Sequence, residues 1–162
     1  MARPRKIFFD ANVVIRAGKP PGRPLIPRVA DLVNAGYAKV VTTDLTKTEI
    51  AKKHAGNDFE VIGELTKRRV RDLAIEILGV ELPEVSPAEL HRRLLAKYQA
   101  SVEEMFRSLR AETLSIDSVK PSVVFDAYAR KGGLFGDDVK KDQFPDAFIL
   151  KSSGRSLQSA IR

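Results

Sequence analysis

Four acidic residues have the types and spacing of a reactive cluster: Asp10, Glu49, Asp142 and Asp146. Asp10 closes a short apolar run, Glu49 opens a predicted helix after a second apolar run, and Asp146 lies just inside another helix start. Acids just past strand ends or at helix starts face the same edge of a parallel sheet, where such folds keep their sites. A carboxylate cluster without histidine or cysteine suits Mg²⁺ or Mn²⁺. On a basic protein, that chemistry indicates phosphodiester hydrolysis.

Length and charge narrow the class of protein. The 162 residues are enough for a single domain, 1–162, with a buried core. There are 28 Lys and Arg against 21 Asp and Glu, and the net charge of +7 favours a polyanionic partner such as nucleic acid. The lack of cysteine excludes disulfides and thiolate metal sites. The first apolar run is too short for a signal peptide and no stretch reaches membrane-spanning length, so we expect a cytoplasmic protein with no membrane partner.

The elements that would position the acids alternate between strand and helix. Short β-branched or aromatic runs predict strands at 6–9, 39–42 and 113–116. Apolar spacing and capping residues predict helices at 27–35, from 43 or 44 to Gly79, from the capping box Ser86-Pro87-Ala88-Glu89 to 109, at 123–130, and from Pro145 onward. This order predicts an α/β fold whose parallel sheet is covered by helices on both faces.

Three segments resemble the PIN-domain nucleases. Ile7-Phe8-Phe9-Asp10-Ala11-Asn12 is similar to the family's first strand, and Glu49 matches the family's helix glutamate. Residues 140–147, Lys-Lys-Asp-Gln-Phe-Pro-Asp-Ala, resemble the lysine and Phe-Pro-Asp-Ala signature of a PIN-like branch with a long helical insertion. The resemblance implies a three-layer α/β/α fold in which the insertion spans 58–110.

The resemblance also implies a mechanism. Asp10, Glu49 and Asp146 would bind Mg²⁺ or Mn²⁺, which would activate a water and stabilise charge on the phosphate. Asp142 is a candidate fourth acid; with Pro145 at the first helical position, we expect it in the preceding loop.

Other residues would hold the substrate. Asn12 would hydrogen-bond Asp10 or a metal-bound water, and Lys141, with Lys140, would contact the phosphate backbone of RNA. The basic run 67–71 would extend this track.

Each acid also has a plainer interpretation. Asp10 is a candidate turn residue, Asp146 a first-turn helix acid, and Glu49 a partner for Lys53 at i+4. The three acids together favour the metal site. His54 and His91 lie beside Lys and Arg in helical patterns, which predicts surface positions for both.

Only 16 residues follow Asp146, whereas PIN domains continue with further parallel strands. We therefore expect about three strands and an unpaired edge beside Asp10, which a second copy of the chain would cover as a homodimer.

The function predicted from the sequence is a metal-dependent endoribonuclease, in the role of a toxin of a toxin–antitoxin or defence system with an antitoxin protein as partner. Two alternatives stay open: an inactive PIN-like RNA-binding or interaction module, and a structure-specific DNA nuclease. A haloacid-type phosphatase would need an aspartate where Asn12 stands.

Overall fold

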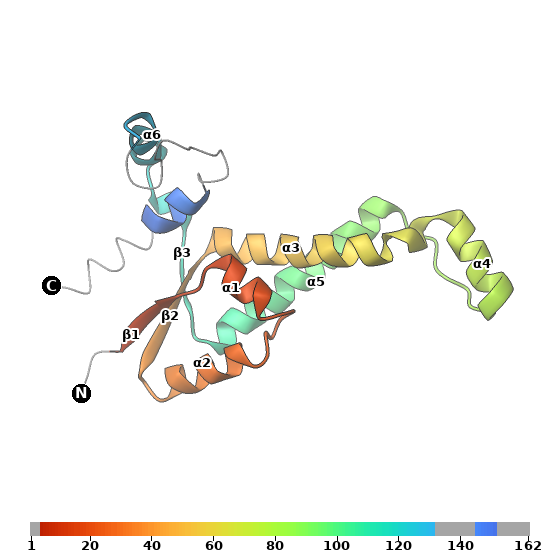
Figure 1. Cartoon of the computed structure of the whole chain (residues 1–162), viewed down its shortest axis with the longest axis horizontal. Coiled ribbons are helices and arrows are strands. Elements are labelled where there is room, and N and C mark those ends of the chain that lie inside the picture. The colour runs from red at the N-terminus through yellow and green to blue at the C-terminus, as the bar shows by residue number, and fades with distance from the viewer. Residues whose placement is uncertain (1–3, 132–144, 152–162) are drawn as a thin grey trace.

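A three-stranded parallel sheet organises the protein, for which the computed structural model describes residues 4–131 and 145–151. The strands are β1 (Arg5–Phe8), β2 (Ala38–Thr43) and β3 (Glu112–Leu114), in the order β1-β2-β3 (Figure 1). Arg5 lies opposite Ala38, and Val41 opposite Glu112. The three predicted strands are confirmed within one or two residues. The fold is mixed α/β, consistent with the predicted α/β/α arrangement.

Two helices connect β1 to β2. Helix α1 (Ala11–Arg16) follows β1 at once and was not predicted, whereas α2 (Leu25–Asn34) begins two residues before its predicted start. Pro27 lies in the first turn of α2, where backbone amides have no partner inside the helix and a proline is tolerated.

The longest helices pack against each other and form much of the core. Helix α3 (Asp44–Ile62) is capped by the Thr43 hydroxyl, which accepts a hydrogen bond from the Thr46 amide at 3.0 Å. Helix α5 (Pro87–Ser108) is capped by Ser86 as predicted. The predicted apolar stripe of α5 is buried at positions 94, 98, 102, 105 and 106. Helices α1, α2, α3 and α5 and strand β2 thus share one apolar core, against which Ile7 of β1 also packs.

An arm extends from this core. It consists of the end of α3, the 3₁₀ helix η1 (Gly63–Thr66), helix α4 (Arg68–Leu78) and the start of α5 (Figure 1). Gly79 ends α4 with a φ of 64°, a left-handed conformation that glycine adopts without strain. The predicted insertion, 58–110, is therefore largely helical.

A smaller core lies near the other end of the molecule. The 3₁₀ helix η2 (Ile116–Ser118) leads to α6 (Pro121–Ala129), and residues 145–151 are helical. Val119, Val124 and Ala147 form a small buried cluster that joins these segments. Among the described residues, no helix is long and apolar enough to cross a membrane.

The predicted surface position of His54 is wrong, because only 4% of this residue is exposed. Its ring stacks on Tyr98 with 5.4 Å between ring centroids, and its Nε2 atom has no hydrogen-bond partner in the described structure. His54 extends the buried stripe of Ile50 and Ala51 along the face of α3 that packs on α5. Its charged neighbours in the sequence lie on other faces of the helix. His91 is exposed, as predicted.

We expect the protein to lose stability below about pH 6.5 in a way that depends on His54. Burial lowers the pKa of His54 below its ordinary value, so the unfolded chain binds a proton that the folded protein resists. The free energy of unfolding should therefore fall as pH drops through the pKa of the unfolded histidine. Urea unfolding at several pH values between 5 and 8 gives the free energy of unfolding as a function of pH. The slope of this free energy against pH should be smaller in His54→Gln than in the wild type. His91→Gln is the control, and an equal slope in all three proteins would contradict the prediction.

Candidate functional site

Asp10 is positioned by the junction between β1 and α1. It caps α1, and its Oδ1 atom accepts a hydrogen bond from the Asn12 backbone amide at 2.8 Å. The expected contact with Asn12 is thus made through the backbone. Asp10 is a turn residue and also faces a cavity, so its two interpretations are compatible.

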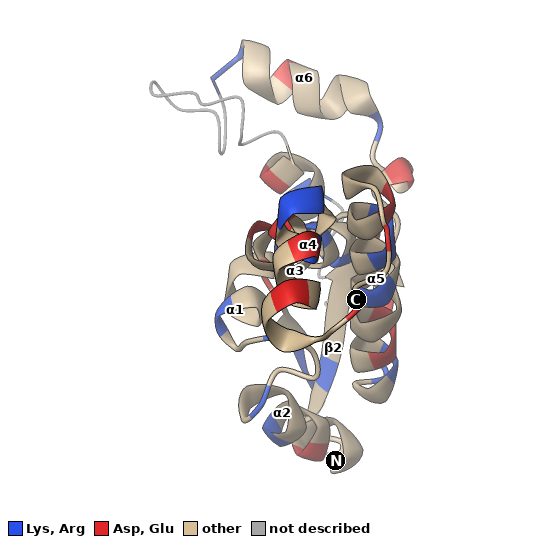
Figure 2. Ribbon diagram, turned by 90° about the vertical axis from the view of Figure 1, so that its right-hand side faces the viewer, with Lys and Arg blue, Asp and Glu red and all other residues tan. Residues whose placement is uncertain are grey.

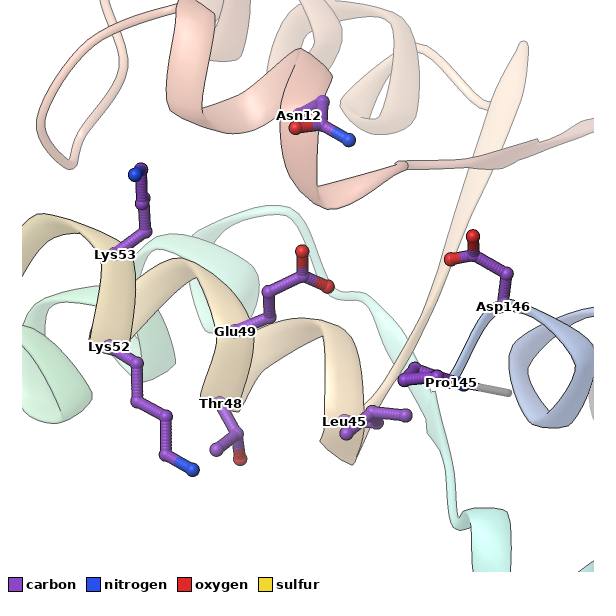
Figure 3. A pocket seen from close by; sticks show the side chains of 8 residues that line it. All are labelled: Asn12, Leu45, Thr48, Glu49, Lys52, Lys53, Pro145 and Asp146. Carbon is purple, nitrogen blue, oxygen red and sulfur yellow. The ribbon is translucent and has the colours of Figure 1, made fainter. Parts of the chain in front are cut away.

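Glu49 lies in the second turn of α3, after the cap that Thr43 provides. Its side chain points toward the side where Asp146 and Asn12 lie (Figure 3). Across the described residues, Glu49 takes part in no ion pair, so the plainer interpretation as a partner of Lys53 is not supported.

Asp146 lies in the helical segment that the structure describes over residues 145–151. The buried cluster around Val124 and Ala147 holds this segment in place.

The three acids line one cavity of about 290 Å³. Its other lining residues come from the end of β1, the start of α1, α3 and the segment 145–151: Phe8, Ala11, Asn12, Thr46, Ile149 and Leu150. A second cavity of about 530 Å³ shares Asn12, Glu49 and Asp146 with the first and adds Leu45, Thr48, Lys52, Lys53 and Pro145 (Figure 3). The two cavities adjoin at these three shared residues, and together we call them the hollow.

Burial and neighbouring negative charge raise the proton affinity of two of these carboxylates, Glu49 and Asp146. Burial raises the pKa of Glu49, and the negative charges of Asp146 and Asp10 raise it further. Burial also raises the pKa of Asp146, with a further contribution from Asp10. A bound cation would stabilise the ionised forms of these acids, because its positive charge offsets the repulsion between them.

The donor set fits a hard cation. Every acid of the cavity offers oxygen, as Mg²⁺ and Mn²⁺ prefer. Within the described ranges, however, no three acidic or histidine side chains converge closely enough to form a ready metal centre. The side chains of Asp10, Glu49 and Asp146 would have to move closer to share one ion.

Comparison with known protein families now adds to this geometry. The family model described as PIN domain matches residues 7–154, a range that contains all four predicted acids. This chain belongs to the PIN-domain family. PIN domains are generally nucleases that use divalent metals, so the family supports an enzyme of this kind. Searches of curated proteins and of solved structures found no match.

Three predicted site residues of this PIN domain, Asp142, Lys140 and Lys141, lie outside the described residues. Their roles, and the branch with the Phe-Pro-Asp-Ala signature, stay predictions. The basic run 67–71 lies in the arm, whose helix α4 is well separated from β1 and α1 in Figure 1. Ion pairs within the arm join Lys67 to Glu64, Arg68 to Asp72 and Arg71 to Glu84. A role for this run in RNA binding stays a prediction.

Two cations of the hollow were not singled out from the sequence. Lys52 and Lys53 follow Glu49 by three and four positions, the spacing that places side chains next to one another on a helix. Lys53 points toward the side of Asn12, whereas Lys52 points the other way (Figure 3). Helical spacing from Glu49 was the available signal, but Lys53 was considered only as an ion-pair partner.

Proposed function

We propose that this PIN domain is a metal-dependent endoribonuclease that hydrolyses phosphodiester bonds. The observation that carries the proposal is that Asp10, Glu49 and Asp146 line one cavity in a chain of the PIN family. These carboxylates would hold Mg²⁺ or Mn²⁺, with Asp142 as a fourth acid. The bound cation would supply electrostatic activation of a water and stabilisation of the phosphate charge.

The residues of the chain have separate tasks in this proposal. The Asn12 amide holds one oxygen of Asp10 and so fixes the direction of that carboxylate. Glu49 and Asp146 line the hollow from two other elements, and a phosphate would bind between them. Lys53 provides a cation at the rim that can pair with the RNA backbone.

Three parts of the proposal rest on the resemblance of the motifs alone. These are RNA as the substrate, the role of a toxin and an antitoxin as partner. One observation favours the alternative of an inactive RNA-binding module: the described acids do not converge into a ready metal centre. The same fold and charge would serve either function, so only the reaction separates them.

The test compares single-stranded RNA with single-stranded DNA of the same sequence, each incubated with Mg²⁺, Mn²⁺ or EDTA. We expect internal cleavage of RNA with either metal and none in EDTA. Cleavage of DNA alone would support a DNA nuclease in place of an endoribonuclease. Binding of RNA without cleavage under all conditions would support the inactive module and overturn the proposal.

RNA affinity should depend strongly on salt and on Lys53. Contacts with phosphates release counterions, so affinity should fall steeply between ~50 and ~200 mM salt. Lys53→Gln should reduce the slope of log affinity against log salt by about 1, as expected for the loss of one phosphate contact. Arg28→Gln is the control, because it removes the same charge from α2, which lines neither cavity of the hollow. Fluorescence anisotropy with a labelled RNA measures the affinity at each salt concentration. Equal salt slopes in Lys53→Gln and the wild type would argue against a contact at Lys53.

A further inference from the structure

One side of α3 continues the hollow toward the arm. Four residues share this side, because they lie three, four and seven positions along the helix from the first of them: Glu49, Lys52, Lys53 and Gly56. The buried apolar residues of α3 lie on its other sides, where α1 and α5 pack. In Figure 3, the two lysines follow Glu49 along α3 in the direction away from Asp146. This side is therefore an open surface that begins at the hollow.

Two cations of this side have no ionic partner among the described residues. Lys52 and Lys53 are exposed, both line the larger cavity of the hollow, and neither belongs to an ion pair. Helical geometry places them on either side of the line that joins Glu49 to Gly56, and their side chains point in opposite directions in Figure 3. A chain that lies along this line would have a positive charge on each side.

The cations of the other long helix are engaged within it. The four basic side chains of α5 contact residues of the same helix: Arg92 and Arg93 pair with Glu89, Arg107 pairs with Glu104, and Lys97 lies over the ring of Tyr98. Basic and acidic residues are accordingly mixed along α5 in Figure 2. Of the two long helices, α3 therefore offers the more available positive charge.

Gly56 lies one turn beyond the lysines, inside α3. Apart from its chain neighbours and the backbone of its own helix, a Cβ atom at this position would meet no described atom within 4 Å. Packing within the described chain therefore does not require a glycine, although glycine stabilises a helix less than alanine does. The missing side chain leaves the helix backbone uncovered, so a ligand can approach it closely.

Acids mark both ends of this side of α3. Glu49 lies at the hollow, where a bound cation would offset its charge. Glu60 is exposed one turn beyond Gly56, on the same side of the helix, and repels a polyanion there. Asp58 lies two positions after Gly56 and therefore on another side, where it pairs with Lys19. The positive section thus ends between Gly56 and Glu60.

We propose that the phosphate backbone of single-stranded RNA runs from the hollow along this side of α3, between Lys52 and Lys53, and comes closest to the helix at Gly56. This path rests on the proposed function, since it starts where the RNA would be cut. Each lysine binds the backbone from its own side, and the strand leaves α3 before Glu60. Contacts of this kind position a strand without reading its sequence.

Substitutions of Gly56 should separate stability from RNA binding. Gly56→Ala should raise the thermal midpoint by about 1–4 °C, because alanine favours a helix and its methyl group has space. Gly56→Leu should lower the affinity for a labelled single-stranded RNA at least about 5-fold, because leucine fills the space of the strand. Its thermal midpoint should not fall below that of the wild type, since leucine also favours a helix. Fluorescence anisotropy in EDTA measures the affinity without cleavage.

Ala96→Leu is the control for added bulk. Ala96 is a small exposed residue on α5 and lines neither cavity of the hollow. The substitution introduces the same leucine side chain on a different helix. The RNA affinity of this variant should stay within about 2-fold of the wild type.

A double-mutant cycle locates the path between the lysines. Lys52→Gln and Lys53→Gln should each reduce the slope of log affinity against log salt by about 1. In the Gly56→Leu background, both substitutions should have a smaller effect, because the strand no longer lies between the two lysines. Effects of the same size in both backgrounds would overturn the path.

The outcomes distinguish the path from the proposed function. Equal affinity in Gly56→Leu and the wild type, with RNA cleaved in Mn²⁺, would overturn the path and leave the nuclease standing. RNA that the wild type binds but never cuts, with affinity lost in Gly56→Leu, would support the path and overturn the nuclease. A wild type that binds no RNA would overturn both.

Discussion

Replacing any one of the cavity acids, as in Asp10→Asn, Glu49→Gln or Asp146→Asn, should lower the rate of RNA cleavage at least about 100-fold. Each substitution keeps the shape of the side chain and removes one negative charge from the hollow that would hold the cation. The loss should appear in single-turnover cleavage at saturating Mn²⁺ and with the protein in saturating excess over RNA, where weaker RNA binding does not contribute.

The same variants should remain folded. The raised pKa of Glu49 and Asp146 means that the folded protein binds their protons more tightly than the unfolded chain does. Ionisation of Glu49 or Asp146 therefore lowers the free energy of unfolding as pH rises through the pKa of that acid. At neutral pH, the variant with the uncharged amide should be as stable as the wild type or more stable. The side-chain oxygen of an asparagine at position 10 can still accept a hydrogen bond from the Asn12 amide and so cap α1.

Glu60→Gln is the matched control, because Glu60 is an exposed acid on the same helix as Glu49 and lines neither cavity. Its cleavage rate and thermal midpoint should equal those of the wild type. Wild-type rates in all three cavity variants would refute the site assignment.

Phe106→Ala should cause the largest loss of stability. Phe106 is 1% exposed in the core between α3 and α5, and the ammonium of Lys47 on α3 lies 5.8 Å from the centre of its ring. Truncating a buried phenylalanine to alanine costs about 3–5 kcal/mol, a large part of the total stability of a domain, which is about 5–15 kcal/mol.

Urea unfolding measures this change. The control is Tyr37→Ala, whose side chain is 71% exposed and should cost less than about 0.5 kcal/mol. A loss below about 1 kcal/mol in Phe106→Ala would mean that the two helices are held together elsewhere.

The sequence predicted those elements whose signals are local. The strands, the caps at Thr43 and Ser86 and the buried stripe of α5 all follow from side chains within a few positions of one another. Helix α1 was missed because Val13, Val14 and Ile15 are β-branched and favour strands by themselves. Burial of Ala11 and Val14 in the shared core overrides that preference.

The sequence predicted that three of the acids lie near one another but not the distances between them. Asp10, Glu49 and Asp146 do line one cavity, as their places after strands and at helix starts indicated. Their separation depends on how α3 and the segment 145–151 pack, and no local pattern encodes it. The burial of His54 was missed for the same reason, because its partner Tyr98 lies on a different helix.

The wide spacing of the cavity acids along the chain also sets the order in which the site is completed. During synthesis, Asp10 and Glu49 leave the ribosome early, and α3 can pack on α5 as soon as residue 108 has followed. Asp146 arrives last, after nearly a hundred further residues from Glu49, which takes on the order of 5–20 s at about 5–20 residues per second. If all three acids are needed, a nascent chain cannot cut RNA during that interval.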